Sequence, residues 1–237
     1  MPEARATLFA TTRWTLVLEA GGSDDTAKSR ALAALCEAYW PPIFAYIRRR
    51  GHGEEAAKDL TQEFFARLLK NDWLSGLTKE GSRFRAFLLV AVKRFLAVER
   101  ERQSAQKRGG GQVPFALDMA GMVEPVSGEE SPERAYDRRW ALTVIDRAVA
   151  RLQSEAKASG RETLFAEVSP FLSAEPEAGA YDRAAGRLGI SRAAVAMTVH
   201  RLRLRLREHV RSEVTETVAD PARLEDEIRE LMAALRG

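Results

Sequence analysis

Hydrophobic positions in the first half of the chain recur every three to four residues, between short polar stretches that contain glycine. This spacing is typical of amphipathic helices, because residues three and four apart lie on one helix face. The pattern predicts helices over residues 12–20, 27–50, 54–69 and 83–102. The intervening GGSDD, GHG and KEGS predict turns, since glycine and small polar residues end helices. Alternating patterns typical of strands are nearly absent.

The composition changes in the middle of the chain, where GGGQVPFALDMAGMVEPVSGEESP is rich in Gly and Pro and lacks helical periodicity. Such a stretch is typical of a flexible linker. Helical patterns resume over residues 133–157, 163–172 and 181–188, then from Arg192, and finally over 221–235. We therefore predict an all-α fold with two helical domains, 1–108 and 133–217, a linker over 109–132 and a C-terminal helical extension over 218–237.

The composition narrows the class of protein. Of the 237 residues, 45% are hydrophobic and 30% are charged, as in an ordinary soluble globular protein. A single cysteine, Cys36, and three scattered histidines predict no disulfide, no metal site and no cofactor. No apolar run reaches the roughly 18 residues of a membrane span, and the first residues lack the apolar core of a signal peptide. We expect a cytoplasmic protein that does not bind membranes.

The segment AYDRAAGRLGISRAAVAMTVHRLRLRLR predicts a short helix, a turn at Gly189 and a second helix capped by Ser191. In the second helix a single stripe of apolar residues should face a core: Val195, Val199, Leu202 and Leu206. This is the pattern of a DNA-reading helix-turn-helix, whose second helix enters the major groove. Our candidates for binding an upstream DNA element are Arg192, Ala196, Met197, His200, Arg201 and Arg203. The alternative is an arginine-rich helix that is merely solvated.

A second feature lies in AAKDLTQEFFARLL, where Leu60, Phe64 and Leu68 form the stripe that should enter the core. Another face of the same helix carries Asp59, Gln62 and Glu63. From the residues alone, that face could be an ordinary solvated surface.

The string DLTQEFFARL resembles the D-L-x-Q-E-x-F helix with which sigma factors grip the clamp helices of the largest RNA polymerase subunit. Downstream, SRFRAFLLVAVKRFLAVERERQSAQKRGGG resembles the promoter-melting part of the same domain, called region 2 in these proteins. The helix-turn-helix resembles their region 4. The order of these matches resembles the small extracytoplasmic-function group of sigma-70 family sigma factors.

The resemblance implies a sigma factor that binds core RNA polymerase and directs it to promoter DNA, with a region 2-like bundle and a region 4-like domain. It implies a polymerase-binding site formed by Asp59, Leu60, Gln62, Glu63 and Phe64. An anti-sigma or other regulatory protein is a further candidate partner.

In the helix from residue 83 we expect a buried face formed by Phe84, Leu88, Ala91, Val92 and Phe95. The candidates for binding the downstream promoter element are the cations around and after this helix: Lys93, Arg94, Arg100, Arg102, Lys107 and Arg108. Some of these cations could instead only solubilise the helix end. The family's usual Trp, Asn and Asp are replaced here by neighbours such as Phe87 and Arg94, which leaves the base preference open.

Two other functions compete with this interpretation. A helix-turn-helix transcriptional regulator that acts without core polymerase would explain the second half and not the first. An enzyme would need clustered carboxylates, a nucleotide-binding glycine loop or an activated nucleophile, and the sequence shows none of these, so we expect no enzyme.

The C-terminal extension has Asp220 and Pro221 before an apolar stripe. The stripe comprises Leu224, Ile228, Leu231, Met232 and Leu235. Such a helix needs a surface to cover, and two remain open: the second domain, or the first domain or a partner in a regulatory contact.

Overall fold

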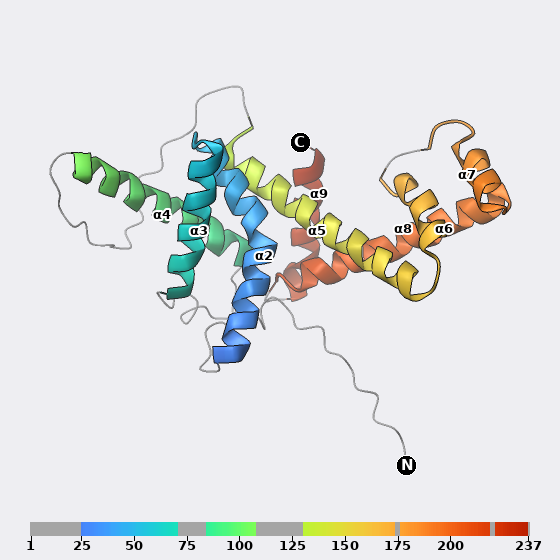
Figure 1. Ribbon diagram of the computed structural model, residues 1–237, viewed down its shortest axis with the longest axis horizontal. Coiled ribbons are helices and arrows are strands. Elements are labelled where there is room, and N and C mark those ends of the chain that lie inside the picture. The colour runs from blue at the N-terminus through green and yellow to red at the C-terminus, as the bar shows by residue number, and fades with distance from the viewer. Residues whose placement is uncertain (1–24, 71–83, 108–129, 174–175, 219–220, 237) are drawn as a thin grey trace, which may run out of the picture. The chain divides into compact units, whose positions relative to one another are not determined.

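The computed structural model describes residues 25–70, 84–107, 130–173, 176–218 and 221–236. Within these ranges the protein is built from helices (Figure 1), which confirms the predicted all-α class. The predicted helix over residues 12–20, most of the predicted linker and Arg108 lie outside the described residues.

The helices begin and end close to the predicted positions. In chain order they are α2 (Asp25–Arg49), α3 (Glu54–Lys70), α4 (Phe84–Lys107), α5 (Pro132–Ala158), α6 (Glu162–Val168), α7 (Ala180–Leu188), α8 (Arg192–Thr215) and α9 (Leu224–Arg236). Single 3-10 turns, η1 (Ser169–Phe171) and η2 (Pro221–Arg223), follow α6 and precede α9. The largest difference is at the end of α4, which continues five residues beyond the predicted residue 102.

The chain divides into two compact units. The first unit comprises Met1–Ala141 together with Thr215–Gly237, and the second comprises Leu142–Val214. The predicted domain over residues 133–217 overlaps the second unit and extends beyond it at both ends. The last helix, α9, therefore belongs to the first unit, although it follows the second unit along the chain.

The core of the first unit is aromatic. The predicted stripe of α4 is buried throughout, from Phe84 to Phe95, and Phe64 of α3 is fully buried beside it. The Phe64 and Phe95 rings meet edge to face with 5.7 Å between centroids, and those of Tyr39 and Phe84 do so at 5.2 Å. Burial of large rings and aliphatic side chains is the main source of stability for such a unit.

The core of the second unit is smaller. Val168, Ala184, Ala185, Val195 and Val199 form its buried cluster. The partly buried Leu164, Phe171, Tyr181, Leu188 and Leu202 pack around them. The predicted α8 stripe is confirmed for its first two valines, while Leu202 and Leu206 are half-buried. The cluster joins α6, α7 and α8 and fixes the orientation of α8 within this unit.

Candidate nucleic-acid interface

The turn between α7 and α8 is held by the two residues that the sequence predicted. Gly189 has φ of +66°, a left-handed conformation that suits glycine, and the Ile190 N–H donates to the Ala185 carbonyl at 3.1 Å. The Ser191 hydroxyl accepts from the Ala194 N–H at 3.1 Å, which confirms Ser191 as the N-cap of α8. A tight turn thus connects two helices that share one core.

The outward face of α8 presents the residues that could reach DNA. Met197 is 55% exposed, and His200 and Arg201 are also exposed. Arg192 is exposed at the start of the helix and pairs with Asp182 at 3.6 Å, whereas Ala196 is half-buried. Four of the six upstream candidates therefore lie on solvent-facing positions of one helix.

Arg203 is placed differently from the other upstream candidates. Its guanidinium is half-buried and donates twice to the Phe171 carbonyl, from Nε at 3.1 Å and from Nη2 at 2.6 Å. This bond ties α8 to the 3-10 turn after α6, so Arg203 supports the second unit rather than its outward face. The spacing could have indicated this, because Arg203 is four residues after buried Val199 and so lies on the same, inward face of the helix.

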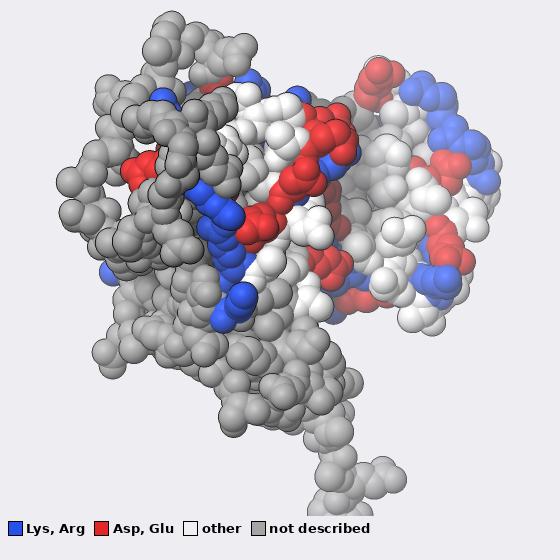
Figure 2. All heavy atoms as spheres, turned by 60° about the vertical axis from the view of Figure 1, so that its left-hand side comes forward, with Lys and Arg blue, Asp and Glu red and all other residues white. Residues whose placement is uncertain are grey.

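The predicted polymerase-binding residues divide between the surface and the core of α3. Asp59, Gln62 and Glu63 are exposed, whereas Phe64 is fully buried and Leu60 half-buried. The structure thus brings the three polar side chains to the surface of one helix. Figure 2, which turns the α3 and α4 side forward, shows a ridge of acidic side chains next to a line of basic ones.

Glu63 has a partner within its own unit. Arg67 donates to Glu63 at 2.9 Å and to Glu99 of α4 at 2.5 Å, and its guanidinium lies 5.2 Å from the centre of the Phe95 ring. Asp59 and Gln62 are therefore the better residues to change when the acidic face is tested, because their replacement does not disturb this bridge between α3 and α4.

The downstream candidates on α4 are only partly exposed. Lys93 pairs with Glu133 at 2.8 Å, and Arg94 is half-buried. Arg100 and Arg102 are exposed, with Glu99 at 3.9 Å from Arg102. The Lys107 side chain, like Arg108, lies outside the described part. The exposed cations of α4 therefore cluster toward its C-terminal half.

A cavity of about 290 Å³, which the sequence did not predict, lies beside these cations. Its lining includes the apolar Leu60 and Leu96 and the basic or titratable Arg50, His52 and Arg100. Burial lowers the pKa of His52, and the neighbouring Arg50 lowers it further. Its lining comes from the turn after α2, from α3 and from α4, so no single helical pattern could have revealed it.

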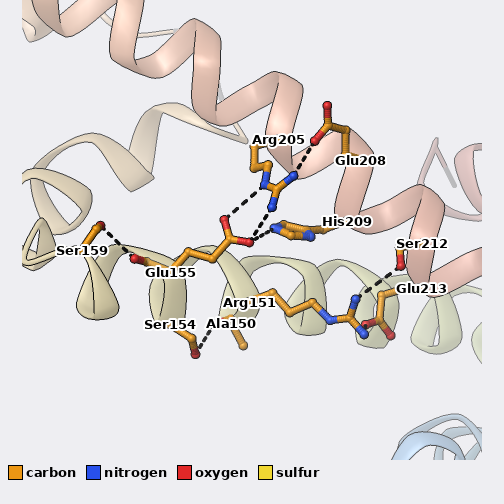
Figure 3. A network of polar contacts seen from close by, with 10 residues as sticks. All are labelled: Ala150, Arg151, Ser154, Glu155, Ser159, Arg205, Glu208, His209, Ser212 and Glu213. Atoms are coloured by element: carbon orange, nitrogen blue, oxygen red, sulfur yellow. Dashed lines mark hydrogen bonds and ion pairs between the residues drawn. The ribbon is translucent and has the colours of Figure 1, made fainter. Parts of the chain in front are cut away.

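Within the second unit, α5 and α8 are joined by a network of charged side chains (Figure 3). Glu155 accepts from Arg205 at 2.9 and 3.2 Å and lies 3.1 Å from His209 Nε2. The hydrogen bond from Arg205 lowers the pKa of Glu155, and His209 adds to the effect. Further along, Arg151 pairs with buried Glu213 at 2.8 Å. The network braces the half of α8 that follows the outward face.

Metal sites and membrane spans are the two other features that bear on the function. Among the described residues, no group of three or more His, Cys, Asp or Glu side chains is arranged to hold a metal ion. Within the same ranges, no helix combines the length and the apolar character of a membrane span.

Searches against models of protein families, curated proteins and solved structures find no match.

Proposed function

We propose that the chain is a sigma factor that binds core RNA polymerase and directs it to promoters. The observation that carries the proposal is the exposed Asp59, Gln62 and Glu63 face on α3, in a unit separate from the helix-turn-helix. A DNA-binding regulator that acts alone needs the second unit and has no use for this face. The resemblance of DLTQEFFARL to the polymerase-gripping helix of sigma factors supports the same assignment.

In this proposal each of three surfaces has one task. The carboxylate and amide groups of α3 bind a basic surface of the polymerase clamp, where charge complementarity favours fast and specific association. The cations of α4 bind phosphates at the downstream promoter element. The start of α8 enters the major groove at the upstream element, where the small and apolar Ala196 and Met197 favour contact with thymine methyl groups.

The polymerase contact is tested by changing Asp59 to Lys and Gln62 to Ala in one protein. Both side chains are exposed, so the fold should persist while the surface loses its acidic and amide groups. We expect the double variant to lose most of its co-purification with core RNA polymerase. Glu162→Lys, a charge reversal at an exposed position in the second unit, is the control and should bind as well as the original chain. Undiminished binding of the double variant would refute the proposed contact.

A further inference from the structure

Arg85 is a buried arginine that none of the surfaces described above uses. It lies in the first turn of α4 with its side chain only 8% exposed. Its guanidinium donates to Glu227 at 3.0 Å, to Glu230 at 2.5 Å and to Asp137 of α5. The same group lies 4.4 Å from the centre of the Trp140 ring. One cation is thus surrounded by three carboxylates and stacked on an indole.

Two of the three carboxylates come from α9, so Arg85 is the polar anchor of that helix on the first unit. Glu227 is almost fully buried, at 1% exposed, whereas the Glu230 side chain is 46% exposed. Burial opposes the charge of Arg85, but Glu227 and Asp137 outweigh burial and raise its pKa. The arginine therefore stays charged. The sequence left two surfaces as possible contacts of α9. In the structure, α9 packs on the first unit.

Helix α9 buries only part of its apolar stripe against the first unit. Leu224 and Leu231 are buried, Ile228 and Leu235 are half-buried, and Met232 is 46% exposed. A helix of 13 residues is marginal in water by itself, so α9 depends on this contact. Buried ion pairs add little net stability, because desolvation offsets their attraction. The ion pairs therefore determine where α9 docks more than they add to its net stability.

The negative charge of α9 opposes binding of nucleic acid at the N-terminal end of α4. Helix α4 has six basic and two acidic residues, whereas α9 has four acidic and two basic residues. The α9 carboxylates hold the cation of α4 that is nearest its N-terminus. A planar guanidinium binds a phosphate with the same bidentate geometry that it uses for a carboxylate.

We propose that Arg85 is a phosphate-binding residue for DNA, and that the Glu227 and Glu230 carboxylates of α9 occupy it in the protein without DNA. The inference rests on the proposed function only in that α4 faces DNA. Trp140 supports the guanidinium from behind, and removal of α9 leaves Asp137 as the only one of the three carboxylates beside it. Helix α9 thus acts as an inhibitor built into the chain.

The first test measures binding of a short fluorescent DNA duplex by the full chain and by a chain that ends at Val218. The truncated chain should bind at least about fivefold more tightly, the lower end of typical coupling between sites. Its plot of log affinity against log salt should be steeper by about 0.9, as expected for one more phosphate contact. Arg85→Ala in the truncated chain should abolish both gains. Equal affinity and slope for the two chains would overturn the proposal.

A second test keeps the chain complete, so that it does not depend on folding of the truncated form. Glu230→Lys reverses a charge within the Arg85 cluster, and Glu225→Lys reverses one at an exposed position of α9 outside it. We expect Glu230→Lys to raise DNA affinity several times more than Glu225→Lys. Equal gains would show that only net charge matters and would exclude the Arg85 site.

A third test separates this inference from the proposed function. A synthetic peptide of residues 218–237, added to the truncated chain, should reduce its DNA affinity, and the same peptide with Glu227→Gln and Glu230→Gln should not. This result requires no polymerase, so a failure to bind core polymerase would leave it standing. Conversely, a peptide without effect would refute the inference while the polymerase contact could still hold.

Discussion

At the turn before α8, single residues decide the direction in which the helix leaves α7. Gly189 accepts a left-handed backbone, and no heavy atom would lie within 4 Å of a Cβ placed there. Gly186, three residues earlier within α7, likewise has open space around a Cβ and no positive φ. These two glycines therefore differ in backbone conformation alone, which makes them a matched pair.

Alanine should have opposite effects at the two positions. Gly189→Ala should lower the free energy of unfolding by about 1 to 2 kcal/mol, because a left-handed conformation strains an L side chain. Gly186→Ala should raise it by up to about 1 kcal/mol, since alanine is the better helix former. Urea titration monitored by circular dichroism measures both. A loss of stability in both variants would contradict the argument from conformation.

The ion pairs of Glu155 predict how stability changes with pH. The pKa of Glu155 is lowered in the folded protein, so its contribution is present above the ordinary value of about 4.3 and is lost as the pH falls through the lower folded value. Glu155→Gln should therefore flatten the acid side of a plot of melting temperature against pH. Glu101→Gln, which removes an exposed carboxylate from α4, should leave that slope in place. Parallel curves for Glu155→Gln and the original chain would refute the role of Glu155.

Residues that depend on distant partners were the hardest to predict from the sequence. The helical pattern predicted Ser191, Gly189 and the buried stripe of α4, because these depend on neighbours within a few positions. Arg85 was not predicted, since Asp137, Glu227 and Glu230 lie 52, 142 and 145 residues away along the chain. Arg203 is among the DNA-binding candidates because its partner, the Phe171 carbonyl, is 32 residues away along the chain.

At the scale of the element, α8 combines two kinds of arginine. Arg201 is exposed on the outward face, whereas Arg203 is bonded to the Phe171 carbonyl. The second half of the helix is braced by α5 through Glu155 and Glu213. The helix can therefore present its first turns to DNA while its remaining turns are held within the second unit.

Replacing each of these two arginines by alanine should impair a different property, DNA binding for Arg201 and stability for Arg203. Arg201→Ala should reduce the affinity for promoter DNA and lower the salt slope by about 1, with unchanged unfolding. Arg203→Ala should cost about 1.5 to 3 kcal/mol of stability, the usual worth of a hydrogen bond from a charged group. Salt titrations of DNA binding and urea titrations distinguish them. The outward face is misassigned if Arg201→Ala leaves DNA binding intact.

At the scale of the whole molecule, two units carry separate surfaces on one chain. The first unit has the acidic and amide face of α3 and the cations of α4, and the second has the outward face of α8. The proposed function needs separate surfaces for binding polymerase and for reading DNA. Helical periodicity predicted which side chains lie on these faces, and the resemblance to sigma factors gave the faces their expected partners. The return of α9 to the first unit depends instead on contacts between residues 142 and 145 positions apart.

The most direct measurement of the central claim is run-off transcription with purified core RNA polymerase and a library of genomic fragments. We predict discrete transcripts that require both core polymerase and this protein. The variant with Asp59→Lys and Gln62→Ala should abolish these transcripts, and Arg201→Ala should weaken them. A protein that binds specific fragments and yet yields no transcript, and does not bind core polymerase, would contradict the account.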